Sequence, residues 1–332
     1  MARPPAVARV VHRLTATARE HGMFPPGGTV LVAVSGGPDS MCLLHALVEA
    51  RRLLRIRLAV FHFDHRLRRG SAEDAAYVRR AAERLGLPFH LREATTAPEP
   101  GASLEDWAHR ARFEALALTM RDADAIRAAL GHTRDDQAET ALIALIRGGG
   151  LDALAGLRPV QGPYVRPLLD VTHDEVEAFC RARHLRPRRD PTNRELRLLR
   201  NAVRLRVLPA IERATGRDPR APMARSAGLL RRDADELERQ ATDAIVELLE
   251  EAPEGQLVPA TALSSLPGAI AARVARAALY RCGVLPTLED VEAVLDLASG
   301  RPGRRRRLTG GLLAARDREY VSVSRTSPES RG

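Results

Sequence analysis

Residues 31–40, with the sequence LVAVSGGPDS, constrain the fold of this chain more than any other segment. A short apolar run leads straight into a glycine pair and then into an amphipathic stretch. The segment therefore predicts a buried strand, a tight loop and the start of a helix. Glycine lets the backbone turn sharply and brings its N–H groups close to an anion. The positive end of the helix dipole favours negative charge at the same place.

The other residues of this loop also suit a phosphate group. Pro38 fits the first helical turn, where its missing N–H costs nothing. Asp39 supplies a carboxylate where a magnesium ion would bridge phosphates, and the serines supply hydroxyl groups. A plain strand–turn–helix joint would require only the glycines, so we favour a nucleotide site. The expected ATP-binding residues are Ser35, Gly36, Gly37, Pro38, Asp39 and Ser40.

The chain is strongly basic, with 52 lysine and arginine residues, 42 acidic residues and a net charge of +10. Every one of the basic residues is arginine. A Walker A loop and Schiff-base catalysis both require lysine, so both are excluded. The excess charge favours a polyanionic partner, and arginine can bind one phosphate through two hydrogen bonds. A GC-rich genome is an alternative explanation of the arginine content.

Targeting and cysteine patterns favour a cytoplasmic protein that does not bind a membrane. The apolar runs are too short to cross a bilayer, and the first residues contain no secretory h-region. Cys42, Cys180 and Cys282 are widely spaced and form no CxxC pair. Neither a disulfide framework nor a zinc ribbon is therefore predicted.

Apolar and amphipathic stretches alternate along the first half of the chain. This alternation predicts an α/β fold, a Rossmann-like parallel sheet with helices on both faces. Capping boxes mark helix starts at Ser71, Ser103, Thr172 and Thr287. The expected strands span residues 29–34, 56–63, 88–93 and 125–130, and the expected helices span residues 38–54, 72–85 and 104–121.

The strand signal fades after about residue 218. Helices are expected at residues 221–251, 260–282 and 288–299. The tail then carries four arginines at 304–307, a glycine pair and an apolar stretch at 319–323, which together predict a small β-hairpin. We therefore expect an α/β domain over residues 1–217, a helical domain over 218–300, and a short β tail with a disordered end over 301–332.

A second motif, GHTRDDQAET at residues 131–140, opens a helix directly after a predicted strand. Asp135 and Glu139 are four residues apart and share a helical face, and Asp136 lies beside them. The alternative is that these carboxylates only favour the helix dipole. Their position at the carboxyl end of a strand favours a ligand site, because open α/β sheets bind ligands there.

The loop at residues 35–40 resembles the PP-loop of the N-type ATP pyrophosphatases, which cut ATP to AMP and pyrophosphate without a Walker lysine. Residues 131–140 are similar to the HHxDDQxET motif of one branch, the tRNA(Ile)-lysidine synthases, with Thr133 where a second histidine is common. This resemblance implies that His132 and Asp136 belong to the catalytic centre. It also implies that Asp39, itself catalytic, and Asp136 hold Mg²⁺, and that Glu139 helps to bind the amino acid.

Three more stretches resemble the same family. Residues 61–68 look like its HxDHxLR segment, although the two histidines have the alternative of only capping a strand end. Residues 109–113 stand in the place of RxxRY, which implies a substrate-binding role for Arg112; the alternative is a solvated helix residue. His109 replaces the first arginine of that element and weakens any role for its position.

The last of these stretches lies between residues 190 and 204. Residues 190–193 look like the family's DPSN element, and the following RNxxR element implies tRNA-binding roles for Arg200, Asn201 and Arg204. A plain soluble face is the alternative for these arginines.

The resemblance implies a complete reaction. ATP adenylates the 2-position oxygen of the wobble cytidine in the CAU anticodon of tRNA(Ile), and pyrophosphate leaves. Free L-lysine then attacks that carbon and expels AMP, giving lysidine. The chain resembles the compact form of the family, because longer members carry a further C-terminal domain. Whether it forms a homodimer stays open.

Three other functions use the same kind of loop. A tRNA thiolase would need a catalytic cysteine pair or CxxC iron–sulfur ligands, and Cys42 and Cys180 are better explained as packing residues. A non-catalytic, nucleotide-dependent RNA-binding protein would be expected to have lost part of the loop or the carboxylates, and the sequence retains both. Amide synthesis on a small acid would leave the positive charge without a purpose.

Overall fold

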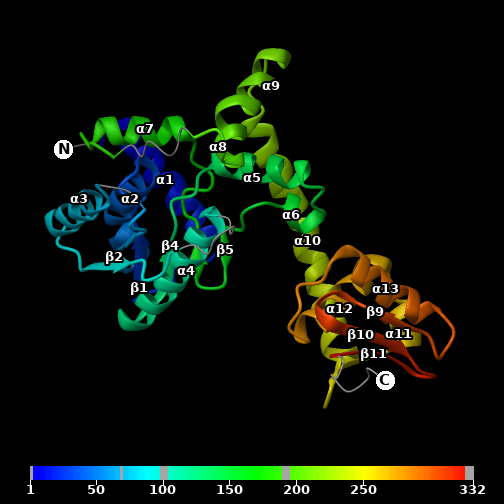
Figure 1. Ribbon diagram of the computed structural model, residues 1–332. Helices are drawn as coiled ribbons and strands as arrows, with labels where there is room; N and C mark the ends of the chain where they lie inside the picture. Colours follow the sequence, from blue (N-terminus) through cyan, green and yellow to red (C-terminus); the bar gives the residue numbers. More distant parts are fainter. Residues whose placement is uncertain (1–2, 68–69, 98–103, 189–194, 326–332) are drawn as a thin grey trace. The chain divides into compact units, whose positions relative to one another are not determined.

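The computed structural model in Figure 1 describes residues 3–67, 70–97, 104–188 and 195–325. The chain divides into two compact units, Met1–Arg231 and Arg232–Gly332. The boundary lies inside helix α10, Arg220–Leu248, whereas we expected it after residue 217. The expected domain bounds therefore stay a prediction. Among the described residues, no helix combines the length and the apolar character needed to span a bilayer.

The first unit is built on a six-stranded sheet in the order β3-β2-β1-β4-β6-β5. All neighbouring strands are parallel except β5 and β6, which form a hairpin. The four predicted strands are confirmed, and the hairpin is an addition that the sequence analysis did not predict. The strands are β1 Thr29–Ala33, β2 Arg57–Asp64, β3 Phe89–Glu93, β4 Ala125–Ala129, β5 Val160–Gln161 and β6 Tyr164–Val165.

The strand order places two loops side by side. The chain adds strands on one side of β1 as far as β3 and then crosses to add β4 on the other side. In open α/β sheets the ligand site lies outside the carboxyl ends of the strands at such a reversal. Residues 34–37 follow β1 and residues 130–133 follow β4, so both motifs border this point.

Helices cover both faces of this sheet, as predicted (Figure 1). The expected helices are confirmed within a residue or two, and α1, α6, α8, η2 and α9 are additions. The helices of this unit are α1 Pro5–Glu20, α2 Pro38–Leu54, α3 Ser71–Arg84, α4 Leu104–Asp122, α5 Arg134–Ile146, α6 Leu151–Leu154, α7 His173–Ala182, α8 Leu199–Ala202, the π-helix η2 Val203–Val207 and α9 Leu208–Thr215.

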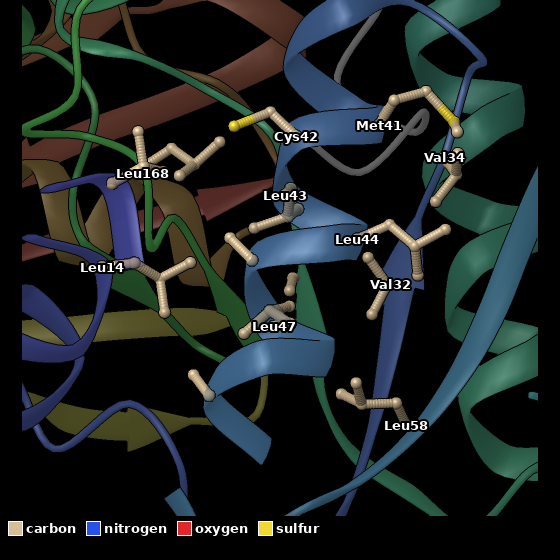
Figure 2. Packing of buried hydrophobic residues seen from close by; sticks show 14 of the residues in the cluster. Leu14, Val32, Val34, Met41, Cys42, Leu43, Leu44, Leu47, Leu58 and Leu168 are labelled. Carbon is tan, nitrogen blue, oxygen red and sulfur yellow. The ribbon is translucent and has the colours of Figure 1, made fainter. Parts of the chain in front are cut away.

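Side chains of β1 alternate between two apolar cores, as the period of a strand requires. Val30 and Val32 pack in the core that also contains α1, α2 and α7. Leu31 points the other way and packs in the core that contains α4. Figure 2 shows α2 inside the first core, with Val32 beside Leu44 and with Leu168 on the opposite side of the helix. A strand buried on both faces explains the continuous apolar run of the sequence.

Two of the predicted capping boxes are confirmed, at Thr172 before α7 and Thr287 before α13. The one predicted at Ser71 is wrong, because Gly70 in a left-handed conformation precedes α3 and Ser71 is already helical. Ser103 lies outside the described residues. Residue spacing therefore predicts the capping box correctly where the threonine is the extended N-cap residue. It predicts the box wrongly where a glycine is the N-cap residue.

The second unit contains a five-stranded antiparallel sheet in the order β7-β8-β11-β10-β9. Val258, Ala314 and Val323 of this sheet pack in one core with side chains of α12 and α13. Its elements after α10 are β7 Glu250–Ala252, β8 Gly255–Pro259, α11 Ala260–Ser265, α12 Gly268–Arg281, α13 Leu288–Ser299, β9 Arg305–Arg307, the 3₁₀ turn Thr309–Gly311, β10 Leu312–Arg316 and β11 Tyr320–Arg325.

Three expectations for this unit need correction. The helix expected at 260–282 is divided into α11 and α12, because Leu266 is extended and Pro267 is the N-cap of a new helix. The helix expected at 221–251 ends at Leu248, and Glu250 already begins a strand. The tail does not form an isolated hairpin, because β11 pairs with β8 as well as with β10. The tail strands thus complete a sheet that begins before α11. The disordered end expected within residues 301–332 is not tested, because residues 326–332 lie outside the described part of the chain.

Candidate active site

Hydrogen bonds among its own polar atoms fix the conformation of the loop between β1 and α2. Gly36 has a φ of +93°, a left-handed conformation that favours glycine, and Gly37 is the N-cap of α2. The Ser40 hydroxyl donates to the Gly37 carbonyl at 3.0 Å and accepts from the Ser35 N–H at 3.2 Å. Ser40 is buried, so its hydroxyl braces the loop from inside. Backbone N–H groups at the start of a helix are able to bind an anion, so the start of α2 fits the predicted phosphate site.

The two motifs meet backbone to backbone. A Cβ atom placed on Gly131 would lie 3.2 Å from the Ser40 nitrogen and 3.3 Å from the Asp39 carbonyl carbon and oxygen. These neighbours are main-chain atoms that cannot swing aside. Glycine at position 131 therefore allows the loop after β4 to lie directly against the start of α2, as the expected juxtaposition of the motifs requires.

Helix α5 starts with a capping box that the sequence analysis did not recognise. The Thr133 N–H and hydroxyl donate to Asp136 Oδ2 at 2.8 and 3.0 Å. The other oxygen, Asp136 Oδ1, accepts from Arg204 at 3.0 Å and from Arg200 at 3.3 Å. Burial alone would raise the pKa of Asp136, but the charges of Arg200 and Arg204 and the hydrogen bond from the Thr133 N–H outweigh it and lower that pKa below its ordinary value. The carboxylate is therefore ionised and fully hydrogen-bonded.

Glu139 shares both of these arginines. Its Oε2 accepts from Arg200 Nε and from Arg204 Nη2, each at 3.0 Å, and its Oε1 accepts from Arg204 Nε at 2.5 Å. Only 1% of the Glu139 side chain is exposed. Asp136, Glu139, Arg200 and Arg204 thus form one ion network of two carboxylates and two guanidinium groups, which we call the four-residue network.

The local fold explains why this network forms. Arg200 lies in α8 and Arg204 in the π-helix that continues it, a rare turn that often marks functional positions. Leu142 of α5 packs with Val203 of the π-helix and with Leu208 at the start of α9. Because Leu142 is three residues after Glu139, it lies on the same face of α5 and fixes the distance between the helices.

The predicted roles of Arg200, Asn201 and Arg204 in tRNA binding remain predictions. Both arginines form ion pairs with carboxylates. Asn201 is buried, and its amide donates to the Glu195 carbonyl at 3.1 Å. The alternative of a plain soluble face does not describe these three side chains. The neighbouring DPTN stretch, residues 190–193, lies outside the described residues.

Arg112 of α4 belongs to the same region. Burial and the nearby positive charge of Arg200 lower its pKa from the ordinary value. A solvated helix residue would not be in this position, so that alternative is not supported. The Arg112 guanidinium adds a third positive charge beside the four-residue network.

His132 follows β4 and is uncharged. Burial lowers its pKa to about 3, and the attraction of Asp136 is outweighed by the repulsion of Arg166, Arg200 and Arg112. Arg166, which no sequence motif singled out, follows β6 and donates from its Nε to His132 Nδ1 at 3.2 Å. No short motif links the two residues, because 34 positions separate them along the chain.

Asp39 is more open than Asp136. One of its oxygens contacts His173 Nδ1 at 3.3 Å, and this hydrogen bond raises the pKa of His173. The His173 N–H also donates to Asp135 Oδ2 at 2.8 Å, which joins the start of α7 to that of α5. His173 is the second residue of this region that the sequence analysis missed; its position at a predicted helix start, after Thr172, was the available signal.

The histidines of residues 61–68 brace the site. His62 is buried and its Nδ1 lies 2.7 Å from the Val34 carbonyl, directly before the glycine loop. Because a carbonyl only accepts, the Nδ1 of His62 carries the proton. The His65 ring packs against Phe63 and Trp107. Both side chains do more than cap a strand end, and Arg68 lies outside the described residues.

The fit of a magnesium ion differs between the two predicted ligands. Asp39 has 29% of its side chain exposed and a single histidine contact, which a hard cation could replace. Both oxygens of Asp136 are occupied by Thr133, Arg200 and Arg204, so this carboxylate would first have to release an arginine. Among the described residues, no three histidine, cysteine or acidic side chains form a ready metal site.

The fold and this site define a PP-loop protein, and a family model described as a PP-loop domain matches residues 8–211. A second model, described as the TilS substrate binding domain, matches residues 259–321. The chain belongs to the tRNA(Ile)-lysidine synthase family. Relatives of that name are 39% identical in Symbiobacterium thermophilum, 38% in Solibacter usitatus and 37% in Gloeobacter violaceus, over 85%, 91% and 86% of this chain.

These relatives differ in length. The chain spans 62% and 68% of the Symbiobacterium and Solibacter proteins, and 87% of the Gloeobacter protein. Among solved structures, the U34-tRNA thiolase NcsA from Methanococcus maripaludis has a TM-score of 0.56 at 17% identity, covering 68% of this chain and 80% of that one. This last likeness shows the fold alone.

Proposed function

We propose that this chain uses ATP to join free L-lysine to the 2-position of the wobble cytidine in the CAU anticodon of tRNA(Ile). The products are lysidine, AMP and pyrophosphate. The observation that carries the proposal is the meeting of two motifs, a glycine loop at the start of α2 and buried carboxylates at the start of α5, through the contact of Gly131 with Asp39. The names of the relatives supply the particular substrates.

The glycine loop would bind the triphosphate of ATP. Its backbone N–H groups and the positive end of α2 stabilise negative charge that grows on the leaving pyrophosphate. When bound, Mg²⁺ would neutralise the phosphates, and Asp39 is the side chain that fits it. The cytidine 2-oxygen attacks the α-phosphorus, the bond to the β-phosphate oxygen breaks, and an adenylated base results.

The four-residue network would bind lysine by exchanging ion pairs. A lysine molecule brings an α-ammonium group and a carboxylate, which match the carboxylates and guanidinium groups of the network. Glu139 and Asp136 would take the ammonium group, while Arg204 or Arg112 would take the carboxylate. The neutral ε-amine then attacks the cytidine C2, the bond from C2 to the adenylate oxygen breaks, and the amine loses a proton as AMP leaves.

The second unit would bind the tRNA backbone. Arg305, Arg306 and Arg307 form the edge strand β9 and are all exposed. This strand lies within residues 259–321, which match the substrate binding domain. Charged edge strands also prevent aggregation, so the arginines have a structural use besides binding. A cytoplasmic location and a homodimer are proposals that agree with this function but have no separate support.

A thiolase is the second candidate, since a thiolase shares the fold. Cys42 and Cys180 are buried in the core around α2, and burial raises the pKa of Cys180 to about 12. Thiols of this kind are poor nucleophiles at neutral pH. The packing role expected for both cysteines therefore has support, and the thiolase does not.

One assay separates the two candidates. Pyrophosphate release from ATP is followed with CAU-anticodon tRNA(Ile) and either free lysine or a sulfide donor. Lysine-dependent incorporation of the amino acid into tRNA supports the proposal. Sulfur incorporation without lysine incorporation would replace it with the thiolase. The Asp39→Asn variant is the inactive control for either outcome.

A further inference from the structure

Arg166 is a buried arginine that has no carboxylate partner among the described residues. It follows β6, and only 5% of the residue is exposed. Its three hydrogen bonds all go to uncharged acceptors: the Arg158 carbonyl at 2.8 Å, the Gln161 side-chain oxygen at 3.2 Å and His132 Nδ1 at 3.2 Å. A guanidinium group in such a place is costly, so its retention needs a reason.

The direction of the bond to His132 is not ambiguous. A guanidinium group has only donors, so His132 Nδ1 must accept and cannot carry a proton. The single proton of the neutral ring therefore sits on Nε2. A carbonyl partner at Nδ1 imposes the opposite tautomer, as it does for His62, which faces the Val34 carbonyl.

The charges around His132 act in the same direction. Arg166, Arg200 and Arg112 repel a proton on the ring, while Asp136 attracts one, and burial decides the balance in favour of the neutral form. Burial and the nearby Arg231 lower the pKa of Arg166 to about 10, which still leaves it charged at neutral pH. Arg166 thus blocks Nδ1 both by its hydrogen bond and by its charge.

We propose that Arg166 is a positioning residue that holds His132 as the neutral Nε2–H tautomer. His132 is then a hydrogen-bond donor during the reaction and not a proton acceptor. A neutral donor can stabilise negative charge on the adenylate oxygen as AMP leaves, and it takes no proton from the lysine amine. The catalytic part of this inference rests on the proposed function, whereas the tautomer does not.

The backbone supports this assignment. Arg166 directly follows the strand that pairs with β4, and its own N–H donates to the Pro159 carbonyl at 2.9 Å. The β5–β6 hairpin therefore delivers both the guanidinium group and its Gln161 anchor to the edge where His132 lies.

Nitrogen NMR on the full chain tests the tautomer without any assay of activity. Histidine and arginine are labelled with ¹⁵N, and His132→Gln assigns the resonances. We expect a protonated Nε2, an unprotonated Nδ1, and a coupling across the hydrogen bond from Arg166 Nε to His132 Nδ1. A proton on Nδ1, or the absence of this coupling in a well-resolved spectrum, would overturn the proposal.

Variants then test the catalytic consequence. Arg166→Met should lower kcat roughly 10- to 100-fold, with the KM for ATP unchanged, because the His132 ring loses its fixed orientation. Arg166→Lys keeps a donor and should recover part of that loss. Arg57→Met is the control, because the side chain of Arg57, at the start of β2, donates to the Thr29 hydroxyl at the start of β1, and among the described residues it touches neither the site nor the β5–β6 hairpin.

A double-mutant cycle distinguishes positioning from general support of the fold. If Arg166 acts through His132, then Arg166→Met should cost only about 2-fold or less in the His132→Gln background. A full additional loss in that background would contradict the proposal. If Arg166→Met does not fold, the coupling in the wild-type protein and the activity of Arg166→Lys still show whether Arg166 positions His132. If the wild type makes no lysidine, the proposed function fails while the NMR result stands.

Discussion

Glu139 illustrates how one buried charge ties structure to activity. Its two oxygens receive three hydrogen bonds from Arg200 and Arg204, and those arginines hold Asp136 as well. In the proposed function, a lysine molecule that binds to either carboxylate would replace an arginine with its own ammonium group. The network would then both stabilise the fold and compete with the proposed substrate.

Replacement of Glu139 by Gln should affect both properties. Half of the negative charge of the network is lost while its two guanidinium groups remain. The free energy of unfolding should fall by about 1–3 kcal/mol, since both arginines are about one third exposed. Lysine incorporation should fall by at least roughly 100-fold, measured by labelled lysine in tRNA.

The control for this variant is Glu114→Gln, an exposed residue on α4. It should change neither quantity. Unchanged lysine incorporation in Glu139→Gln would show that the network does not bind the amino acid.

His45 of α2 predicts a sensitivity to acid. Burial, and then the charges of Arg183 and Arg84, lower its pKa to about 4 from 6.5. Between about pH 6.5 and 4, His45 is protonated in the unfolded chain and neutral in the folded chain. The free energy of unfolding therefore falls as the pH drops through this range. Between pH 7 and pH 5 this contribution should cost about 1–2 kcal/mol.

Urea unfolding at pH 7 and pH 5 measures this effect. His45→Gln should lose less stability between the two values than the wild type does. Equal losses in both proteins would mean that His45 is not responsible. The comparison between variants cancels the contributions of other groups, including His132.

Site residues could be predicted where they belong to a continuous sequence motif. They could not be predicted where only the fold brings them to the site. The glycine loop and the acidic start of α5 are each a continuous run of residues, so the sequence indicated the chemistry of each. Arg166 and His173 reach the site from other elements, and only the β6 and α7 positions in three dimensions bring them there. The residue type of Arg166 did not mark it as a site residue, because it is one of 52 basic residues in the chain.

At the scale of elements, the contact between the β4–α5 loop and α2 sets the geometry of the site. Gly131→Ala would push a Cβ to within 3.2 Å of the Ser40 nitrogen. Because main-chain atoms cannot give way cheaply, the loop must shift. We expect the KM for ATP to rise roughly 10-fold or more.

Gly228→Ala is the matched control, because Gly228 lies within helix α10 and a Cβ there meets nothing within 4 Å. It should raise the free energy of unfolding by about 0.5–1 kcal/mol and leave ATP use unchanged. An unchanged KM for ATP in Gly131→Ala would show that the close approach has no part in nucleotide binding.

The edge strand β9 gives a second prediction at this scale. Replacement of Arg305, Arg306 and Arg307 by Gln removes three charges that the structure exposes. If they contact phosphates, the plot of log affinity for tRNA against log salt should lose up to about 2–3 units of slope. An unchanged slope would leave β9 with only its protective role at the sheet edge.

Whole-molecule organisation was predictable in part. The alternating pattern of the first half predicted the parallel sheet, because a strand buried on both faces is a continuous apolar run. Strand β8 gave no such pattern: its inward residues are Gln256 and Val258, and a glycine and a proline bound it. Its strand identity comes from pairing with β11, some sixty residues later, and the sequence does not show that pairing.

The two units imply a division of labour. The first unit contains the glycine loop, the four-residue network and His132, and the second contains a separate apolar core with a basic edge strand. The proposed chemistry therefore belongs to the first unit and the capture of tRNA to the second. A net charge of +10 over the whole chain favours both steps with a polyanionic substrate.

Mass analysis of nucleosides tests the central claim most directly. CAU-anticodon tRNA(Ile) is incubated with the protein, ATP, Mg²⁺ and lysine, and then digested. We predict lysidine together with one AMP and one pyrophosphate for each nucleoside formed, and none of them with Asp39→Asn. Unmodified cytidine at the wobble position, with the wild-type protein folded and bound to tRNA, would contradict the proposed function.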